Sequence, residues 1–262
     1  MNIDKKYYQE INENLTNTIQ DTNISAPNKK VGKVRDAYFL NDKVVMISTD
    51  RQSAFDRVLA AIPYKGAVLN SVSAWWFKKT EHLFPNHLIS TPDPNVSIVE
   101  KCTVFPVEFV VRGYITGTTD TSLWTVYNNG DREYCGNSLP EGLKKNDKLD
   151  KPMLTPTTKD KVHDRPVSRE EIIDLGLMSA EDYDLAAKMS LDLFAFGQET
   201  AKKNGLILVD TKYEIGTDSK GKIKFVDEIH TPDSSRFWIS SSYKDRINSG
   251  QEPENIDKEF LR

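Results

Sequence analysis

The sequence predicts an α+β protein, in which antiparallel β-hairpins and helices occupy separate stretches of the chain. Residues 34–40 and 43–49 read as strands around Asn41-Asp42, a two-residue turn signal of a β-hairpin. A second pair of short apolar strands surrounds a tight turn after Gly205, directly behind the longest helical pattern. Hairpins with segregated helices favour this class over a βαβ repeat.

Periodicity and capping signals predict the other elements of the first half. Residues 4–19 carry an apolar stripe at helical spacing, which predicts an amphipathic helix packed on the sheet. Asn70 is a candidate N-cap for a helix that stops before Pro85. Residues 101–111 read as a strand, with Pro106 at an edge or a kink.

The second half combines a polar stretch with two capped helices. Residues 128–151 are rich in turn residues and charge, which favours a solvated surface loop; a mobile cover over a site is the alternative. Ser168 and Glu171 form a capping-box sequence for a short helix. Ser179 starts the longest helix, which ends before Gly205, a C-cap signal.

Composition argues against several classes of protein. The 262 residues are 28% charged and 38% hydrophobic with a net charge of −4, unlike the basic composition of most nucleic-acid-binding domains. The two cysteines, Cys102 and Cys135, form neither a disulfide framework nor a CxxC zinc site. The N-terminus lacks the apolar core of a signal peptide, and no stretch reaches about eighteen apolar residues. We therefore expect a cytoplasmic protein that binds neither nucleic acid nor membrane.

Charged residues interrupt the strands of the second hairpin where core residues would be expected. If residues 218–221 form its loop, Asp227 lies opposite Lys212. Because side chains alternate along a strand, one face then carries a lysine and three carboxylates: Asp210, Lys212, Glu214 and Asp227. Such a face suits Mg²⁺ carrying phosphate oxygens, since Mg²⁺ takes one or two protein carboxylates plus substrate oxygens. The alternative is a solvated outer face, and a slip of one residue would move Asp227 to the other side.

Two stretches are candidate anion sites. Gly32 lets backbone approach a ligand, and Lys33 and Arg35 point to the same side of an extended segment, which suits a polyphosphate. Cations at the start of an edge strand also serve simply to prevent aggregation. Arg112 ends an apolar strand shortly before Thr118 and a predicted helix, a pattern that suits phosphate. An ordinary threonine cap beside a surface arginine is the alternative.

Three further stretches carry polar side chains that also have local explanations. Ser53 and Asp56 are a candidate cradle for a sugar or carboxylate, although such residues usually bond nearby backbone. Lys159 is placed to reach a nucleotide, and His163 invites a proton-transfer role, although a loop histidine is usually just solvated. Arg236 follows an Asx-turn sequence and projects near the strand that carries the acidic residues.

The combination of these stretches is more specific than any one of them. Two anion sites and an acidic metal patch are what a reaction joining a nucleoside triphosphate to a second phosphorylated substrate requires. No serine or cysteine nucleophile motif is present, so a hydrolase triad has little support. A small-molecule kinase and a non-catalytic nucleotide sensor are the rival interpretations.

Several multi-residue segments resemble, in order, those of the phosphoribosylaminoimidazole-succinocarboxamide synthase (SAICAR synthetase) family. They are VGKVRDAY, STDRQSAFD, VVRGYITGT, LPEGL, TPTTK, VHD, LILVDTKYEIG and VDEIHTPDSSRFW. The resemblance covers about residues 30–238, nearly the whole chain. Motifs in register over such a length are highly specific.

The resemblance implies an ATP-dependent carboxylate–amine ligase of de novo purine biosynthesis. Members join L-aspartate to the carboxylate of carboxyaminoimidazole ribonucleotide (CAIR), giving SAICAR, ADP and phosphate. The implied fold is an antiparallel nucleotide-binding lobe, residues 1–110, and an α+β lobe with the metal and ribonucleotide site, residues 111–262. This arrangement is similar to ATP-grasp and kinase folds, with ATP in the cleft between the lobes. Mg²⁺ is the implied cofactor, and a homo-oligomer is left open.

The resemblance also implies residue roles. The Mg²⁺–ATP ligands are Glu214 and Asp227, and catalysis is assigned to Lys212 and Asp210. The other expected ATP contacts are Gly32, Lys33, Arg35, Phe105, Val107 and Lys159, of which Phe105 and Val107 face adenine through backbone groups. The expected ribonucleotide contacts are Ser53, Asp56, Arg112, Thr118 and Arg236. Asp210 and His163 are both candidates for handling the aspartate amine.

Overall fold

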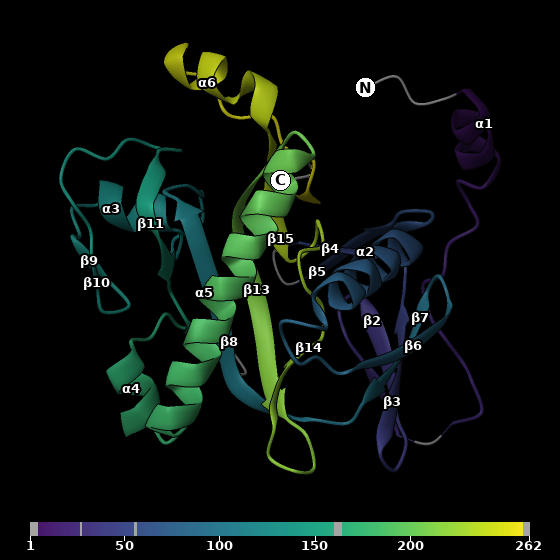
Figure 1. The fold of residues 1–262 in the computed structure, drawn as a ribbon. Helices are drawn as coiled ribbons and strands as arrows, with labels where there is room; N and C mark the ends of the chain where they lie inside the picture. Colours follow the sequence, from purple (N-terminus) through teal and green to yellow (C-terminus); the bar gives the residue numbers. More distant parts are fainter. Residues whose placement is uncertain (1–4, 27, 55–56, 160–163, 259–262) are drawn as a thin grey trace. The chain divides into compact units, whose positions relative to one another are not determined.

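The computed structural model describes residues 5–26, 28–54, 57–159 and 164–258. The chain divides into two compact units (Figure 1). The first holds Met1–Glu81 and Asn86–Cys102, and the second holds His82–Pro85 and Thr103–Arg262. The boundary expected after residue 110 falls inside strand β8 (Thr103–Tyr114). Both units are built on antiparallel sheets with helices, which confirms the α+β class.

A five-stranded antiparallel sheet forms the body of the first unit, in the order β1-β2-β3-β7-β6. The strands are β1 (Lys29–Val31), β2 (Arg35–Phe39), β3 (Lys43–Ser48), β6 (Leu88–Asp93) and β7 (Val96–Glu100). The main-chain N–H of Leu40 donates to the Lys43 carbonyl at 2.9 Å, which closes the turn at Asn41-Asp42. The predicted hairpin is therefore confirmed.

Helix α2 (Lys65–Thr80) packs on β3 and β7 and buries Trp76. The predicted N-cap at Asn70 is wrong, because the helix begins before it. Asn70 instead lies buried inside the helix, where its amide donates to the Pro94 carbonyl at 2.9 Å and accepts from Ser97 Oγ at 2.7 Å. The side chain ties the helix to the sheet below it.

The first unit also holds a short helix and a second, small sheet. Helix α1 (Lys5–Glu13) leaves Tyr8 62% and Ile11 39% exposed, so the predicted packing of residues 4–19 on the sheet is wrong. Strands β4 (Arg51–Ala54) and β5 (Arg57–Ala61) pair antiparallel. They follow β3 directly and carry the polar sequence that was a candidate substrate cradle.

A six-stranded antiparallel sheet forms the body of the second unit. Its main path is β11-β8-β13-β14, with β12 paired to β8 and β15 paired to β13. Besides β8, the strands are β11 (Lys148–Leu154), β12 (Thr157–Thr158), β13 (Leu206–Thr217), β14 (Ile223–Val226) and β15 (Ser235–Ile239). The two twelve-residue strands β8 and β13 lie at its centre.

Helix α5 (Ala180–Lys203) lies along one face of this sheet (Figure 1). Burial alternates along β8, where Val107, Phe109 and Val111 are fully buried, and the Phe109 ring lies 5.7 Å from that of Tyr183 on α5. The predicted caps are confirmed, since Ser179 Oγ accepts from the Asp182 N–H at 3.1 Å. Residues 168–171 likewise form the expected capping box at helix α4 (Arg169–Asp174).

The remaining elements are short. They are helices α3 (Leu123–Asn128) and α6 (Ser240–Asn248), and strands β9 (Glu133–Tyr134) and β10 (Asn137–Ser138). The prediction of a solvated loop over residues 128–151 is wrong, because Tyr134, Leu139 and Leu149 from this stretch join a buried cluster with residues of α3. Scattered single apolar residues, without a strand or helix period, build this small core.

Candidate active site

The face of the central sheet opposite α5 carries a row of charged side chains. Strand register places Asp210 of β13 beside Arg112 of β8, and Glu214 beside Glu108. Lys212 lies between these two pairs on the same face. The predicted sharing of one face by Asp210, Lys212 and Glu214 follows from this register. Because side chains alternate along a strand, the apolar residues of β8 and β13 are buried under α5 and the polar row lies on the opposite face.

Lys212 is the centre of the row. Its Nζ lies 3.0 Å from Glu108 Oε1 and 3.0 Å from Glu214 Oε1. Lys159, which follows β12, forms a second ion pair with Glu214. Glu214 therefore accepts two ammonium groups, one on each carboxylate oxygen.

This arrangement fixes the charges of its members. Burial works against the charged form of Lys212, but the carboxylates of Glu214, Glu108 and Asp227 raise its pKa well above the usual value. Burial also opposes ionisation of Glu214, yet the ammonium groups of Lys212 and Lys159 lower its pKa. Lys212 and Glu214 are therefore both charged at neutral pH.

The predicted register of the hairpin is wrong by one residue. Thr217 pairs with Ile223, so residues 218–222 form the loop and Asp227 does not pair with Lys212. The cause is local: Asp218 Oδ1 accepts the N–H groups of Lys220 and Lys222, both at 2.9 Å, which holds Lys222 in the turn.

Asp227 nevertheless influences the charge of Lys212, the lysine that the predicted register places opposite it. Strand β14 ends at Val226, and the backbone of Asp227 is left-handed with φ 61°. Its carboxylate is one of those that raise the pKa of Lys212. A left-handed residue, rather than strand alternation, therefore accounts for the effect of the Asp227 carboxylate on Lys212.

Two arginines share one carboxylate at the other end of the row. Arg236 Nη1 donates to Asp210 Oδ2 at 2.8 Å, and Arg112 Nη1 lies 4.0 Å from the same oxygen. Arg112 Nε also donates to Thr155 Oγ1 at 2.8 Å. Arg112 is only 9% exposed, so this part of the site concentrates positive charge in a largely buried place.

The turn at Gly117 lies against this arginine pair. A Cβ on Gly117 would stand 3.4 Å from Arg236 Nη1 and 2.4 Å from Ser122 Cβ, and its φ of 102° also favours glycine. The helix beyond it is capped by Ser122, so the alternative interpretation, a threonine cap, is wrong. Thr118 is exposed directly beside the turn.

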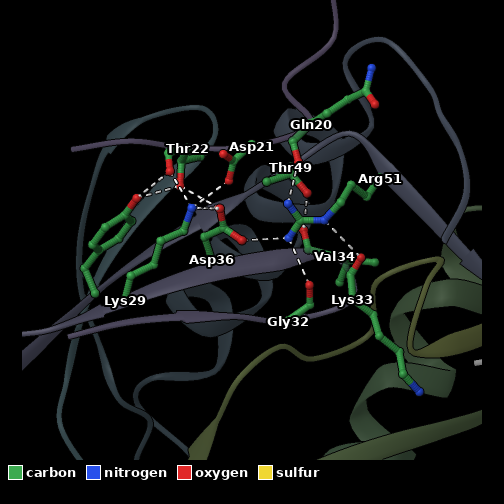
Figure 2. Close-up of polar contacts among 11 residues, drawn as sticks. Gln20, Asp21, Thr22, Lys29, Gly32, Lys33, Val34, Asp36, Thr49 and Arg51 are labelled. Atoms are coloured by element: carbon green, nitrogen blue, oxygen red, sulfur yellow. Dashed lines mark hydrogen bonds and ion pairs between the residues drawn. The ribbon is translucent and has the colours of Figure 1, made fainter. Parts of the chain in front are cut away.

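The glycine loop of the first unit is a tight turn between β1 and β2. The Gly32 N–H donates to the Arg35 carbonyl at 2.8 Å, and a Cβ on Gly32 would stand only 2.8 Å from that oxygen. Figure 2 shows the Lys33 side chain extending away from the ion pairs around Asp36. The loop therefore requires glycine at this position in order to close on its own backbone.

The remaining predicted site residues lie outside the row of charged side chains or outside the described residues. Ser53 is buried on β4, whereas Asp56 and His163 lie outside the described residues. Phe105 and Val107 lie in β8 where the register with β13 shifts between Glu214 and Gly216. This bulge turns the backbone of that segment out of the regular ladder.

The sequence predicts no role for Glu108 and Arg51, two charged residues that form ion pairs in the structure. Glu108 lies in a strand whose sequence is largely apolar. Only the pairing of β8 with β13 shows that it accepts a hydrogen bond from Lys212. Arg51 lies in a recognised motif, yet its contacts span more than thirty residues of chain, up to Gln20. Asp50, in the same motif, accepts the N–H groups of Ile19 and Gly66 at 2.8 and 2.9 Å.

No group of three or more His, Cys, Asp or Glu side chains able to hold a metal ion occurs within residues 5–26, 28–54, 57–159 and 164–258. Glu214 and Asp227 are two carboxylates around one ammonium group, and Mg²⁺ needs only one or two protein carboxylates when phosphate supplies other oxygens. These residues therefore fit a nucleotide-borne Mg²⁺ and not an all-protein metal cage. In the described part of the chain, we find no helix with the length and apolarity to cross a membrane.

Behind this sheet lies a buried histidine that should make stability depend on pH. Burial lowers the pKa of His230 to about 3, and the ring pairs with the Tyr213 hydroxyl. The folded protein then binds fewer protons than the unfolded chain below the ordinary histidine pKa of about 6.5. We expect the unfolding free energy to fall between pH 7 and pH 5, by up to about 1.4 kcal/mol per pH unit from this group.

Denaturant unfolding at several pH values checks this expectation. His230→Asn keeps a residue that tolerates the left-handed backbone (φ 53°) and should lose that part of the slope. The exposed His82→Asn is the control and should keep the wild-type slope. An equal slope in wild type and His230→Asn would contradict the expectation.

Comparison with known proteins shows a consistent likeness. The family model described as SAICAR synthetase matches residues 28–262. The phosphoribosylaminoimidazole-succinocarboxamide synthase of Legionella pneumophila strain Lens is 59% identical over 244 residues, which cover 93% of this chain and 78% of that protein. The chloroplastic enzyme of Vigna aconitifolia is 57% identical over 253 residues, covering 95% of this chain and 74% of that protein.

Solved structures agree with the sequence comparisons. The SAICAR synthase of Saccharomyces cerevisiae complexed with SAICAR superposes with a TM-score of 0.80 and 33% identity, covering 93% of this chain and 86% of that one. A type-2 SAICAR synthetase in complex with ADP gives 0.74 and 26%, with 90% of each chain covered. Both likenesses extend over nearly the whole chain.

Proposed function

The chain belongs to the SAICAR synthetase family, and from this premise we propose how its charged residues carry out the family reaction. The enzyme is an ATP-dependent ligase of purine biosynthesis, which joins L-aspartate to the carboxylate of CAIR with release of SAICAR, ADP and phosphate. The observation that carries the residue assignments is the row on β8 and β13. At one end Arg112 lies near Arg236 of the neighbouring strand β15, and at the other end lies a lysine–carboxylate cluster.

The arginine end is suited to the phosphate of the ribonucleotide. Arg112 and Arg236 both contact the carboxylate of Asp210, so two guanidinium groups lie close together in a largely buried place. Guanidinium groups bind phosphate oxygens in pairs, and such charged hydrogen bonds are among the strongest in proteins. We assign Thr118, beside the Gly117 turn, to the same phosphate. Ser53 and Asp56 remain our proposal for the ribose or carboxylate of CAIR.

The lysine end is suited to the phosphoryl group that is transferred. Lys212 and Lys159 both form ion pairs with Glu214. Positive groups fixed before the reaction stabilise charge on a transferring phosphoryl group without having to reorganise. We propose that Glu214 and Asp227 hold Mg²⁺ with the ATP phosphates. The ion would supply further neutralisation of that charge.

The first unit contributes further nucleotide contacts in this proposal. Gly32, Lys33 and Arg35 are assigned to the triphosphate. In the second unit, the backbone around Phe105 and Val107 is assigned to adenine, because the bulge there interrupts the ladder with β13.

Cytoplasmic localisation stays a prediction from the sequence.

The chemistry explains why phosphoryl transfer comes first. A free carboxylate is a poor acylating agent, because oxide would have to leave. Transfer of the γ-phosphoryl group to the CAIR carboxylate gives an acyl phosphate, from which the aspartate amine displaces phosphate. Asp210 is engaged by Arg236, so we propose that it orients the arginines and does not accept the amine proton. No covalent enzyme intermediate is needed.

A coupled assay for ADP release tests the reaction. With ATP, Mg²⁺ and CAIR present, we expect ADP release to continue only when L-aspartate is added, and SAICAR to form in equal amount. Steady ADP release without aspartate, accompanied by a stable phosphorylated product, would identify a kinase instead. Nucleotide binding with no turnover at all would favour the sensor interpretation.

A further inference from the structure

One side chain, Arg51, binds the carbonyl groups of the glycine loop. Its Nη2 donates to the Gly32 carbonyl at 2.9 Å, and its Nε donates to the Lys33 carbonyl at 3.3 Å (Figure 2). Thr49 holds the next carbonyl, that of Val34, with its N–H at 2.9 Å and its Oγ1 at 2.8 Å. Three successive carbonyls are thus bound from the interior of the unit.

The guanidinium is itself fixed in place. Its Nη2 donates to Asp36 Oδ1 at 2.7 Å, and its Nη1 donates to the Gln20 carbonyl at 2.5 Å. Asp36 is fully buried, and its other oxygen accepts from Thr22 Oγ1 at 2.7 Å and from Lys29 Nζ at 3.1 Å. Figure 2 shows these contacts meeting at the Arg51 guanidinium and the Asp36 carboxylate. Arg51 has little freedom to move independently of the loop.

Holding the carbonyls inward aims the loop's donors outward. In a planar trans peptide the N–H points opposite to the carbonyl of the preceding residue. The N–H groups of Lys33 and Val34 therefore face away from Arg51, because the Gly32 and Lys33 carbonyls face toward it. Successive N–H groups on one side of a turn form a concave site that attracts anions.

We propose that Arg51 is a positioning residue that presents the main-chain N–H groups of Lys33 and Val34, together with the Lys33 side chain, to the triphosphate of ATP. The inference rests on the proposed function, in which this loop binds the nucleotide. Arg51 acts through the loop and does not itself touch the substrate. Its planar, forked guanidinium is required, because a lysine ammonium cannot address two carbonyls and a carboxylate in that geometry.

The conservative variant Arg51→Lys separates geometry from charge. We expect KM for ATP to rise by about tenfold, the loss of roughly one charged hydrogen bond, while KM for CAIR stays within about twofold. The dissociation constant for ADP, measured by calorimetry without turnover, should rise by a similar factor. A purely structural role would lower the amount of active enzyme and leave both KM values unchanged.

Arg132→Lys in the second unit is the matched control. Arg132 also donates to a carboxylate, Glu141, and to two main-chain carbonyls, those of Tyr127 and Asp131. The same chemical change there should leave KM for ATP and the ADP affinity as in wild type. A wild-type KM for ATP in folded Arg51→Lys would overturn the proposal, as would an equal rise in Arg132→Lys.

A second variant covers the case in which Arg51→Lys does not fold. Thr49→Val removes the hydroxyl bond to the Val34 carbonyl but keeps the main-chain bond to the same oxygen. It should raise KM for ATP by about threefold to tenfold, the loss of about one neutral hydrogen bond, and an unchanged value would then overturn the proposal. Wild-type enzyme that released no ADP from its three substrates would refute the proposed function instead, and the ADP affinities would still decide the role of Arg51.

Discussion

Arg112→Ala should raise KM for CAIR by about 100-fold, because it removes charged hydrogen bonds worth roughly 1.5–3 kcal/mol each from a largely buried site. The remaining partner, Arg236, is already engaged by Asp210 at 2.8 Å and cannot replace the missing positive charge. KM for ATP and for aspartate should change little. Initial-rate kinetics with each substrate varied in turn measure all three values.

Two further variants separate phosphate binding from loss of structure. Arg112→Lys keeps the positive charge but loses the fork and the bond from Nε to Thr155, so its KM for CAIR should lie between wild type and Arg112→Ala. Arg132→Ala removes a more exposed arginine of the same unit and should leave KM for CAIR unchanged. A folded Arg112→Ala enzyme with wild-type KM for CAIR would refute the phosphate assignment.

Glu214→Gln should reduce kcat/KM for ATP by about 100-fold or more, because it removes a proposed Mg²⁺ ligand and leaves two ammonium groups without their shared carboxylate. The Mg²⁺ concentration needed for half-maximal rate should rise. Fold should persist at neutral pH, since Glu108 and Asp227 still stabilise the Lys212 ammonium. Rates over a Mg²⁺ titration and nucleotide affinity by calorimetry test these points.

The pH dependence of stability gives this variant an independent check. The lysines lower the pKa of Glu214 below its unfolded value of about 4.3, so its contribution to stability is present above that pH and is lost as the pH falls further. The difference in unfolding free energy between wild type and Glu214→Gln should therefore shrink below about pH 4.3.

Glu252→Gln is the control for the charge removal, because Glu252 is also bound by a lysine, Lys145, and by Asn146. Its Mg²⁺ and ATP dependence should match wild type. Normal nucleotide affinity and Mg²⁺ dependence in Glu214→Gln would exclude the ligand role.

Alternation along strands was enough to predict the polar row on the central sheet. Asp210, Lys212 and Glu214 are two residues apart, and any straight strand puts them on one face. The predicted position of Asp227 depends on the length of the hairpin loop. That length is set by one side chain, because Asp218 accepts the N–H of Lys222 and holds it in the turn. The predicted strand register is therefore wrong by one residue. The left-handed backbone at Asp227 leaves no signal in the periodicity of the sequence.

Residues that act across distant parts of the chain were harder to predict. Glu108 sits in a strand that reads as apolar, and its role follows only from its pairing with Glu214. Arg51 meets the loop at Gly32 and the carboxylate of Asp36 through tertiary contacts that leave no local sequence pattern. Asn70 had the sequence of a helix cap, but tertiary bonds to Pro94 and Ser97 decide its position.

The central claim is that Glu214 and Asp227 hold a divalent cation with the ATP phosphates. The most direct test is a crystal structure of the full chain with Mn²⁺ and a non-hydrolysable ATP analogue, in which anomalous scattering locates the ion. We expect the ion at about 2.1 Å from carboxylate oxygens of both Glu214 and Asp227 and from phosphate oxygens. An ion bound only by phosphate, or placed elsewhere while both carboxylates keep their lysine partners, would contradict the claim.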